Sequence, residues 1–529
     1  MDFYIFVVGL LFILAISDLM VGVANDAVNF TNSAIGSKAA SRTVIMIIAS
    51  LGIIVGTTFS GGMMEVARKG IFNPEAFLFP EIMVIFLAVM FTDVLLLDLF
   101  NTFGLPTSTT VSMVFELLGA AIAIASVKLF SLGLDFSSIG IYINSDKVVA
   151  IITAIPMSVI IAFTAGVIAQ FITRIIFTFK YKNTFKKVGA LWGATGITLI
   201  LYFILLKGLK GSTLLSPESI DWIGKNTFSI VGCSFAALTV ILFFVIRFTR
   251  INMLRIIVLI GTFALALGFA SNDLVNFVGV PMAGFHAYLT ALSNANPMTL
   301  MMTALSKPIQ PQSFILISAG LVMITTLWFS RKARTVTDTE VELARQGKAK
   351  EKFGKSRVAA SIVEFAMFGI NLGRKPFPAA MQTWVGKRFK TKSFFKKADK
   401  KNTPAFDLLR ASVNLVVAST LIAIGTSYKL PLSTTYVTFM VAMGTSLSDR
   451  AWGSESAVAR VNGILTVIGG WFFTALIASA LAAIQALIIY FGGLTAIIIL
   501  VILSVFFVYR THLLHKQRTK NDDPSKAVG

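Results

Sequence analysis

Long apolar runs recur along the whole of this 529-residue chain. Each run has about 20 residues, the length that an α-helix needs to cross a hydrocarbon core of ~30 Å. The chain is 13% charged, whereas a soluble domain carries about 25% charged residues. We therefore expect an all-α integral membrane protein and exclude a soluble enzyme. About a dozen transmembrane helices are predicted, near residues 3–21, 43–60, 82–100, 111–133, 148–178, 188–207, 228–247, 253–271, 313–330, 408–425, 461–490 and 493–509.

The basic residues, which give the chain a formal charge of +21, gather beside these runs. The stretch 331–405 alone holds 19 Lys and Arg against 6 Asp and Glu. Positive charge next to membrane spans collects on the cytoplasmic side, so a basic cytoplasmic insert is predicted here, in a protein of the plasma or inner membrane. Anionic membrane lipids suit such clusters. Nucleic acid does not, because no aromatic stacking platform accompanies the charges.

A polar motif with the core Asn-Asp-x-Val-Asn-Phe occurs twice, each time beside the end of an apolar run. A second motif, Leu-Pro-x-Ser-Thr-Thr, also occurs twice, and the two pairs follow the same order along the chain. The ordered set indicates an internal repeat. The motif residues are Asn25, Asp26 and Asn29 with Ser108, Thr109 and Thr110 in the first half, and Asn272, Asp273 and Asn276 with Ser433, Thr434 and Thr435 in the second.

The spacing of the motifs predicts the domain organisation. Asn25 and Asn272 are 247 residues apart, while Ser108 and Ser433 are 325 apart, so the second half holds 78 extra residues. The first Asn-Asp motif follows the first span and the second follows the eighth, which places the halves in opposite orientations, as in many secondary transporters. We expect two inverted repeats with discontinuous half-helices, divided as 1–178 (first repeat), 179–252 (connecting spans), 253–330 and 408–509 (second repeat), 331–407 (insert) and 510–529 (basic tail).

The Ser-Thr-Thr motifs have the features of helix starts within the membrane. Pro and Ser or Thr are favoured at the first positions of a helix, and apolar runs follow both motifs. A helix start presents unsatisfied N–H groups and a partial positive charge, which together bind anions. The alternative is that these hydroxyls only cap their own helices.

The Asn-Asp motifs suit a cation. A buried carboxylate in a membrane span is costly and usually marks an ion pathway, and carboxylate and amide oxygens one helical turn apart can hold a hard cation or a shared proton. Two aspartates and an anion cannot share a pocket without compensation, since each like-charge pair at about 4 Å costs roughly 4 kcal/mol at an effective dielectric constant of ~20. Symport with sodium or protons is therefore predicted.

At these motifs the sequence resembles the inorganic phosphate transporter family, which includes low-affinity phosphate carriers and sodium–phosphate symporters. The resemblance covers about residues 1–178 and 253–490. It implies phosphate as substrate, bound through Asn25, Asp26, Ser108, Thr109, Thr110, Asn272, Asp273, Ser433, Thr434 and Thr435. It implies a coupling cation at Asp26, Asn29, Asp273 and Asn276, with no organic cofactor and no metal beyond sodium. A homodimer is left open.

The chain departs from the family pattern after each Ser-Thr-Thr, where Val111 and Tyr436 replace a histidine. Three acidic residues in or near spans, Asp93, Asp98 and Glu116, have no clear family counterpart. We expect one of them to relay protons, unless they only form interhelical hydrogen bonds.

Three alternatives to a phosphate symporter are open at this stage. A carrier of another tetrahedral oxyanion, such as sulfate, would share the architecture. A channel or structural membrane protein would leave the repeated Asn-Asp motifs unexplained. A membrane enzyme lacks support, because the sequence has no H-E-x-x-H helix and no phosphate-binding Gly-Lys-Ser/Thr loop.

Overall fold

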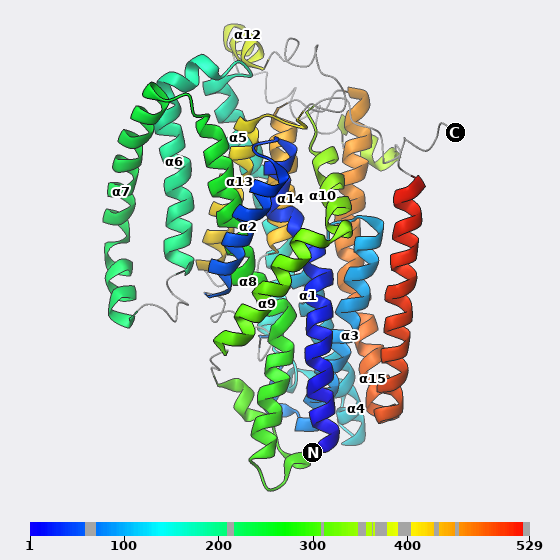
Figure 1. Cartoon of the computed structure of the whole chain (residues 1–529). Helices are drawn as coiled ribbons and strands as arrows, with labels where there is room; N and C mark the ends of the chain where they lie inside the picture. The colour runs from blue at the N-terminus through cyan, green and yellow to red at the C-terminus, as the bar shows by residue number, and fades with distance from the viewer. Residues whose placement is uncertain are drawn as a thin grey trace.

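The computed structural model describes residues 1–58, 70–208, 216–307, 312–346, 356–361, 363–364, 378–389, 404–427, 433–449 and 454–521. Leu430, Pro431 and Leu432 of the second Leu-Pro motif, most of the basic insert and the end of the tail lie outside these residues. The described part of the chain contains helices, two isolated β-bridges and no β-strand. The predicted all-α membrane architecture is confirmed (Figure 1).

The first half contains α1 (Asp2–Gly36), α2 (Arg42–Thr57), α3 (Phe79–Phe103), α4 (Thr109–Ser131) and α5 (Ser145–Phe177). A lateral pair, α6 (Lys182–Gly208) and α7 (Pro217–Phe248), joins it to the second half. The second half contains α8 (Met253–Leu292), α9 (Ser313–Phe329), α10 (Arg331–Leu343), α12 (Ala379–Arg388), α13 (Leu408–Ser427), α14 (Thr434–Ser448) and α15 (Ser454–Asn521). Short 3₁₀ turns occur at Pro74–Ala76, Phe136–Ile141, Pro297–Thr299 and Thr303–Ser306.

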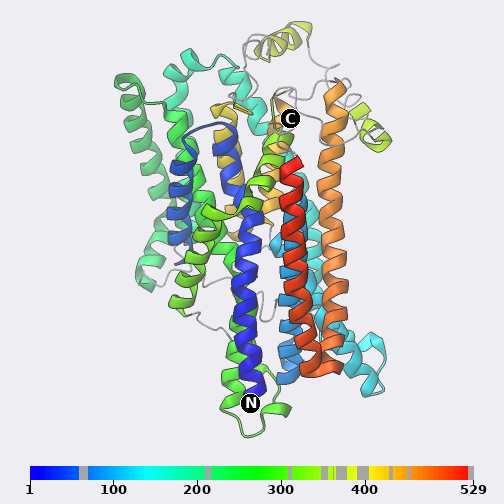
Figure 2. The same ribbon diagram turned by 45° about the vertical axis from the view of Figure 1, so that its right-hand side comes forward.

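Each predicted span overlaps a helix, and the last two fall within α15. Gly493, with φ 53° and ψ −137°, breaks the helical geometry of α15. Beyond Gly493 the chain reverses, so that the second part of α15 runs back beside the first part of the same helix (Figure 2). Within the described residues, eight helices are long and apolar enough to cross a membrane, or nine if the bent pair of α9 and α10 is one span.

The two long motif helices, α1 and α8, cross in opposite directions. Phe30 packs on Phe269, and Phe12 packs on Phe285. The residue numbers rise along one helix as they fall along the other, so the helices are antiparallel (Figure 1). At the crossing, a Cβ on Gly22 would lie 2.0 Å from the Phe277 ring, and glycine permits this approach.

The helices that carry the Ser-Thr-Thr motifs pack on helices of the opposite half. The start of α3 and the end of α4 are joined by the ion pair Lys128–Glu81, which makes these two helices a hairpin. The other hairpin, α13 and α14, comes from the opposite end of the molecule. Helix α4 packs on α15 and α14 packs on α5, each through a glycine: a Cβ on Gly119 would lie 2.0 Å from the carbonyl oxygen of Ser479, and one on Gly444 would lie 2.2 Å from that of Phe163.

The first part of the expected insert belongs to the helical bundle. Helix α10 packs against α1 and α3, and Val336 and Glu340 are fully buried. Glu340 accepts a hydrogen bond from Asn32 of α1. Helix α10, the first part of the predicted insert, therefore packs into the helical bundle.

Candidate functional site

The antiparallel crossing of α1 and α8 brings the two Asn-Asp motifs to the same level. Both motifs lie inside uninterrupted helices, because local helical hydrogen bonding continues through them. Asp26 is fully buried and Asp273 is 2% exposed. Their carboxylates are near enough to repel each other electrostatically.

The starts of α4 and α14 bring the Ser-Thr-Thr motifs to these carboxylates. Ser108 caps α4 by accepting a hydrogen bond from the Val111 N–H at 3.2 Å, and Ser433 caps α14 by accepting one from the Tyr436 N–H at 3.2 Å. The two serines therefore serve their own helix ends. The threonines that follow, in the first turns of α4 and α14, point away from their own helix axes toward the aspartates.

Each aspartate accepts a hydrogen bond from a threonine of each half. Thr109 donates to Asp26 Oδ2 at 2.9 Å, and Thr435 donates to Asp26 Oδ1 at 3.1 Å. On the other side, Thr434 donates to Asp273 Oδ2 at 2.6 Å, and Thr110 approaches Asp273 Oδ1 at 3.4 Å. Thr109 corresponds to Thr434 in the repeat, and Thr110 to Thr435, so the pattern obeys an internal two-fold symmetry.

The second asparagine of each motif extends the symmetry. Asn29 Nδ2 donates to Thr435 Oγ1 at 2.9 Å, and Asn276 Nδ2 donates to Thr110 Oγ1 at 2.9 Å. Asn29 also lies 3.4 Å from Asp26 Oδ1. Each amide nitrogen therefore holds the threonine that comes from the opposite half, and the Asn29 nitrogen also faces the Asp26 carboxylate one turn away.

Asn25 supports the site from behind. Its Oδ1 accepts the Thr107 N–H at 2.8 Å, and its Nδ2 donates to Asn101 Oδ1 at 2.8 Å and to the Leu105 carbonyl at 3.1 Å. Asn101 in turn donates to the Val21 carbonyl at 2.7 Å. The Asn25 amide thus fixes the turn between α3 and α4. Its repeat partner, Asn272, is half-buried.

The enclosed site combines donors and acceptors that suit an anion and a cation together. Nearly all of its motif residues are buried; only Thr110 and Asn272 are half-buried. Helix geometry leaves the amides at the starts of α4 and α14 without intrahelical partners, and they favour negative charge. Two carboxylates with neighbouring amide and hydroxyl oxygens provide ligands for a hard cation such as sodium.

Two side chains that complete the surroundings, Asn101 and Thr438, were not predicted from the sequence. Asn101 was hidden at the end of an apolar span. Thr438 donates to Asn29 Oδ1 at 3.2 Å from one turn into α14. The Tyr436 ring stacks on Trp471 with ring centroids 3.8 Å apart, and Trp471 Nε1 donates to the Pro106 carbonyl at 3.1 Å. Tyr436, which replaces the family histidine, therefore packs the second helix start against α15.

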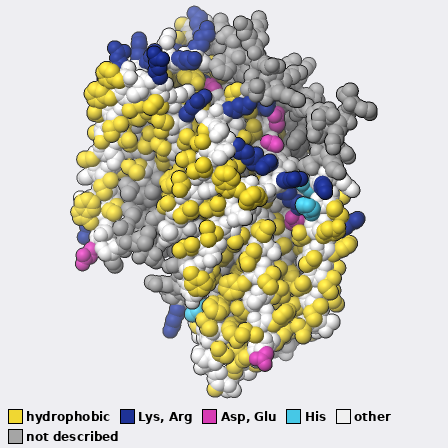
Figure 3. Space-filling view, in the orientation of Figure 1, with side chains coloured by type: hydrophobic (Ala, Val, Ile, Leu, Met, Phe, Trp, Pro, Cys, Tyr) yellow, Lys and Arg dark blue, Asp and Glu magenta, His cyan; other side chains and the backbone are white. Residues whose placement is uncertain are grey.

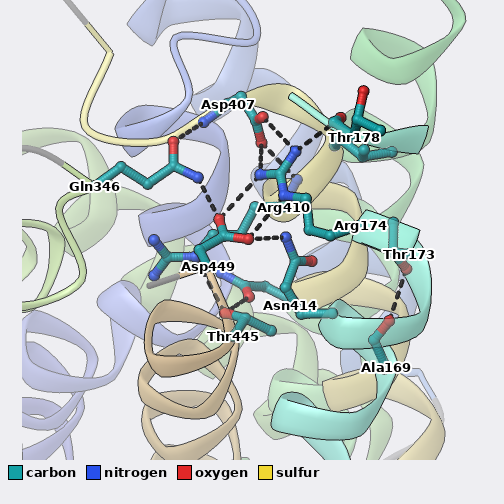
Figure 4. Close-up of polar contacts among 12 residues, drawn as sticks. Ala169, Thr173, Arg174, Thr178, Gln346, Asp407, Arg410, Asn414, Thr445 and Asp449 are labelled. Carbon is teal, nitrogen blue, oxygen red and sulfur yellow. Dashed lines mark hydrogen bonds and ion pairs between the residues drawn. The ribbon is translucent and has the colours of Figure 1, made fainter. Parts of the chain in front are cut away.

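A buried charge network at the other end of α14 holds the second hairpin in place (Figure 4). Arg174, at the end of α5, pairs with Asp449 at 2.7 Å and with Asp407 at 2.8 Å. Arg410 donates to Thr445 at 3.2 Å, and Thr445 donates to Asn414 at 2.6 Å. The network connects α5, α13 and α14. The sequence signal for it, charged residues at the ends of spans, was present but unused.

Of the three unassigned acids, Asp98 has a structural partner. Its Oδ1 lies 2.6 Å from Lys332 Nζ of α10, and its Oδ2 accepts from Thr511 of α15. Asp98 therefore joins the bundle to the last helix, which does not support a relay role for it. Asp93 and Glu116 are buried elsewhere, and neither forms an ion pair with a basic residue in the described part of the chain.

Comparison with known proteins identifies the family. The model of the phosphate transporter family matches residues 22–342, more than half of the chain. The chain belongs to the phosphate transporter family. Membership in a transporter family also removes the enzyme alternative.

Individual members of the phosphate transporter family are distant from this chain. A protein named as a phosphate permease from Thermococcus kodakarensis is 25% identical over 278 residues, which is 50% of this chain and 63% of that protein. One from Helicobacter pylori strain J99 is 28% identical over 340 residues, or 60% of this chain and 58% of that protein. The chain thus spans less than two thirds of the length of these relatives.

A solved structure agrees on the fold over almost the whole molecule. It is described as the sodium-dependent phosphate transporter, and it superimposes with a TM-score of 0.61 over 93% of this chain and 100% of its own. At 15% sequence identity, this likeness establishes the fold of this family member but not its ligands.

Proposed function

We propose that this chain imports inorganic phosphate in symport with a cation, sodium in the first place. One observation carries the proposal: two buried aspartates, one from each inverted half, each meet threonines at the starts of two helices that enter from opposite ends of the molecule. The names of the family relatives and of the structural neighbour point to the same substrate and cation.

The charges of the site favour joint binding of phosphate and cation. Phosphate at the helix starts would face the free amides and the threonine hydroxyls, which stabilise negative charge. Asp26 and Asp273 are negative themselves, so phosphate alone would be repelled. A sodium ion beside Asp26 and Asn29, or beside Asp273 and Asn276, neutralises a carboxylate and removes this repulsion.

Phosphate fits the aspartates better than sulfate does. A hydrogen phosphate ion can donate its O–H to a carboxylate, whereas sulfate has no proton to donate at neutral pH. Sulfate remains the second candidate, because the helix starts alone would accept any tetrahedral oxyanion.

The two hairpins provide the moving parts of a transport cycle. The starts of α4 and α14 meet at the aspartates, while the open ends of the two hairpins lie at opposite ends of the molecule. Rocking of one repeat against the other would expose the site to each side in turn. The end that carries most of the visible Lys and Arg side chains (Figure 3) would be cytoplasmic by the positive-inside rule, in the plasma or inner membrane.

Uptake of radiolabelled phosphate into proteoliposomes tests this function. We expect saturable uptake that an inward sodium gradient accelerates and that excess unlabelled phosphate abolishes. Excess sulfate should compete at least tenfold less well than phosphate. Equal competition by sulfate would identify a general oxyanion carrier, and uptake that fails to saturate would identify a channel.

A further inference from the structure

Three carboxyl groups from different helices meet inside the first half of the bundle. They are Asp18 of α1, Asp93 of α3 and Glu116 of α4, with exposed fractions of 0%, 1% and 0%. Asp93 lies within hydrogen-bonding reach of both Asp18 and Glu116. The symport site described above does not include any of them.

The cluster has almost no donors to stabilise three negative charges. Ser112 donates to Glu116 Oε1 at 2.6 Å. Among the described residues, both oxygens of Asp18, both of Asp93 and the second oxygen of Glu116 have no hydrogen-bond donor. Asp18 in particular is a fully buried, unpartnered side chain that α1 directs at the pair on α3 and α4.

No neighbouring cation compensates the cluster within the described residues. Two lysines on the adjoining helices have other acidic partners, Lys128 with Glu81 and Lys332 with Asp98. Between Arg460 and Arg510, α15 has no charged residue. The other titratable groups on α1 and α8 are Asp2, Tyr4 and Asp26 on α1, and Arg255, Asp273, His286 and Tyr288 on α8.

Three adjacent buried carboxylates cannot all be ionised, because like charges in contact and loss of hydration both favour the protonated form. The described residues also contain no group of three or more His, Cys, Asp or Glu side chains arranged to hold a metal ion. We propose that Asp18, Asp93 and Glu116 form a proton-binding site that is linked to anion binding at Asp26. The linkage rests on the proposed function, whereas the proton site itself does not.

Helix α4 connects the cluster to the symport site. Thr109, Ser112 and Glu116 lie at positions i, i+3 and i+7, which is one face of the helix. Thr109 bonds to Asp26 at one end of this row, and Glu116 joins the carboxyl cluster at the other. Asp26 is also near enough to Asp18 for their charges to interact.

The linkage follows from charge. An anion beside Asp26 adds negative charge near the carboxyl cluster. A carboxylate of the cluster therefore takes up a proton from the solvent and becomes a neutral carboxylic acid. By reciprocity, protonation of the cluster strengthens anion binding by the same factor. The site would therefore make phosphate binding stronger at low pH, at any fixed sodium concentration.

Infrared spectroscopy of the purified protein tests the proton site without any phosphate. We expect a C=O stretching band of protonated carboxyl groups at neutral pH that weakens in Asp93→Asn and in Glu116→Gln. Asp98→Asn is the matched control, because Asp98 is a buried acid already paired with Lys332, and it should leave the band unchanged. Identical spectra for the wild type and both cluster variants would overturn the proposal.

Phosphate affinity measured against pH, at constant sodium, tests the linkage. Over the same pH range, the phosphate affinity of the wild type should change at least about fivefold more than that of Glu116→Gln. A coupling of this size is typical between two linked sites. Comparison of the two proteins at each pH removes the titration of phosphate itself. Parallel pH profiles would refute the linkage. A wild type that binds no phosphate would refute the proposed function, while the infrared result would still decide the proton site.

Discussion

Asp26 and Asp273 occupy equivalent positions on two antiparallel helices, and each accepts hydrogen bonds from threonines of both halves of the chain. The relationship means that neither half contains a complete site. A change in the angle between the halves must alter the contacts of both carboxylates together, and this suits a carrier that alternates between two states.

Neutralising either aspartate should impair transport to a similar degree. Asp26→Asn and Asp273→Asn each remove a charged acceptor of two threonine hydroxyls and, in the proposed function, a ligand of the coupling cation. Hydrogen bonds to charged groups contribute about 1.5–3 kcal/mol, so we expect initial uptake rates to fall by at least tenfold in each variant. Asp146→Asn, an exposed acid in the first turn of α5, is the control and should transport normally. A large loss in only one of the two variants would contradict the symmetric site.

The threonines and serines of the repeated motif should behave differently. Thr109→Val and Thr434→Val each remove a hydroxyl donor from a buried carboxylate, at a cost of about 1–3 kcal/mol. Phosphate affinity should fall by about tenfold, and Thr→Ser at the same positions should restore it. Ser108→Ala and Ser433→Ala remove helix caps, worth ~1 kcal/mol of stability, and should lower the melting temperature more than the affinity.

The close packing of α4 on α15, and of α14 on α5, depends on glycine. Gly119→Ala and Gly444→Ala would place a methyl group 2.0 and 2.2 Å from backbone oxygens of the neighbouring helices. Such overpacking typically costs 1–3 kcal/mol, so both variants should unfold at lower temperature in detergent. Gly232→Ala on α7, where nothing lies within 4 Å, should unfold like the wild type. Normal stability of both core variants would show that these helices do not pack so closely.

The Arg174 network should stabilise the fold more than any surface ion pair. Arg174→Ala leaves Asp407 and Asp449 buried without their main cation, a change that costs about 3–5 kcal/mol for a buried pair. A much lower melting temperature is expected. Glu342→Ala, which breaks the partly exposed pair with Arg345, should cost under about 1 kcal/mol. Equal shifts for the two variants would argue against a structural role for the network.

The sequence was sufficient to predict the helical class and the meeting of the motifs. Apolar length identifies spans, and the repeated order of the Asn-Asp and Ser-Thr-Thr motifs indicated that they form one site. It could not show that the serines cap the helices while the threonines reach the aspartates. That division depends on the rotation of each helix about its axis, which the hairpin and the crossing of α1 and α8 determine.

Two other features also depended on tertiary contacts. Helix α10 looked like part of a polar insert because it is rich in charge, yet its apolar face packs on α1 and Lys332 pairs with Asp98. Asp93, Asp98 and Glu116 looked alike in sequence. Only the positions of their neighbours separate a salt-bridged acid from two members of a carboxyl cluster.

The dependence of phosphate affinity on sodium is the most direct test of the account. Phosphate binding to the purified protein should be measured at constant pH, with sodium replaced by potassium to hold the ionic strength constant. The proposed function has the anion and the cation share Asp26 and Asp273, so phosphate should bind about tenfold or more tightly in sodium, and Asp26→Asn should reduce this difference. Equal phosphate affinity in sodium and in potassium would contradict the claim that sodium and phosphate bind together at these aspartates.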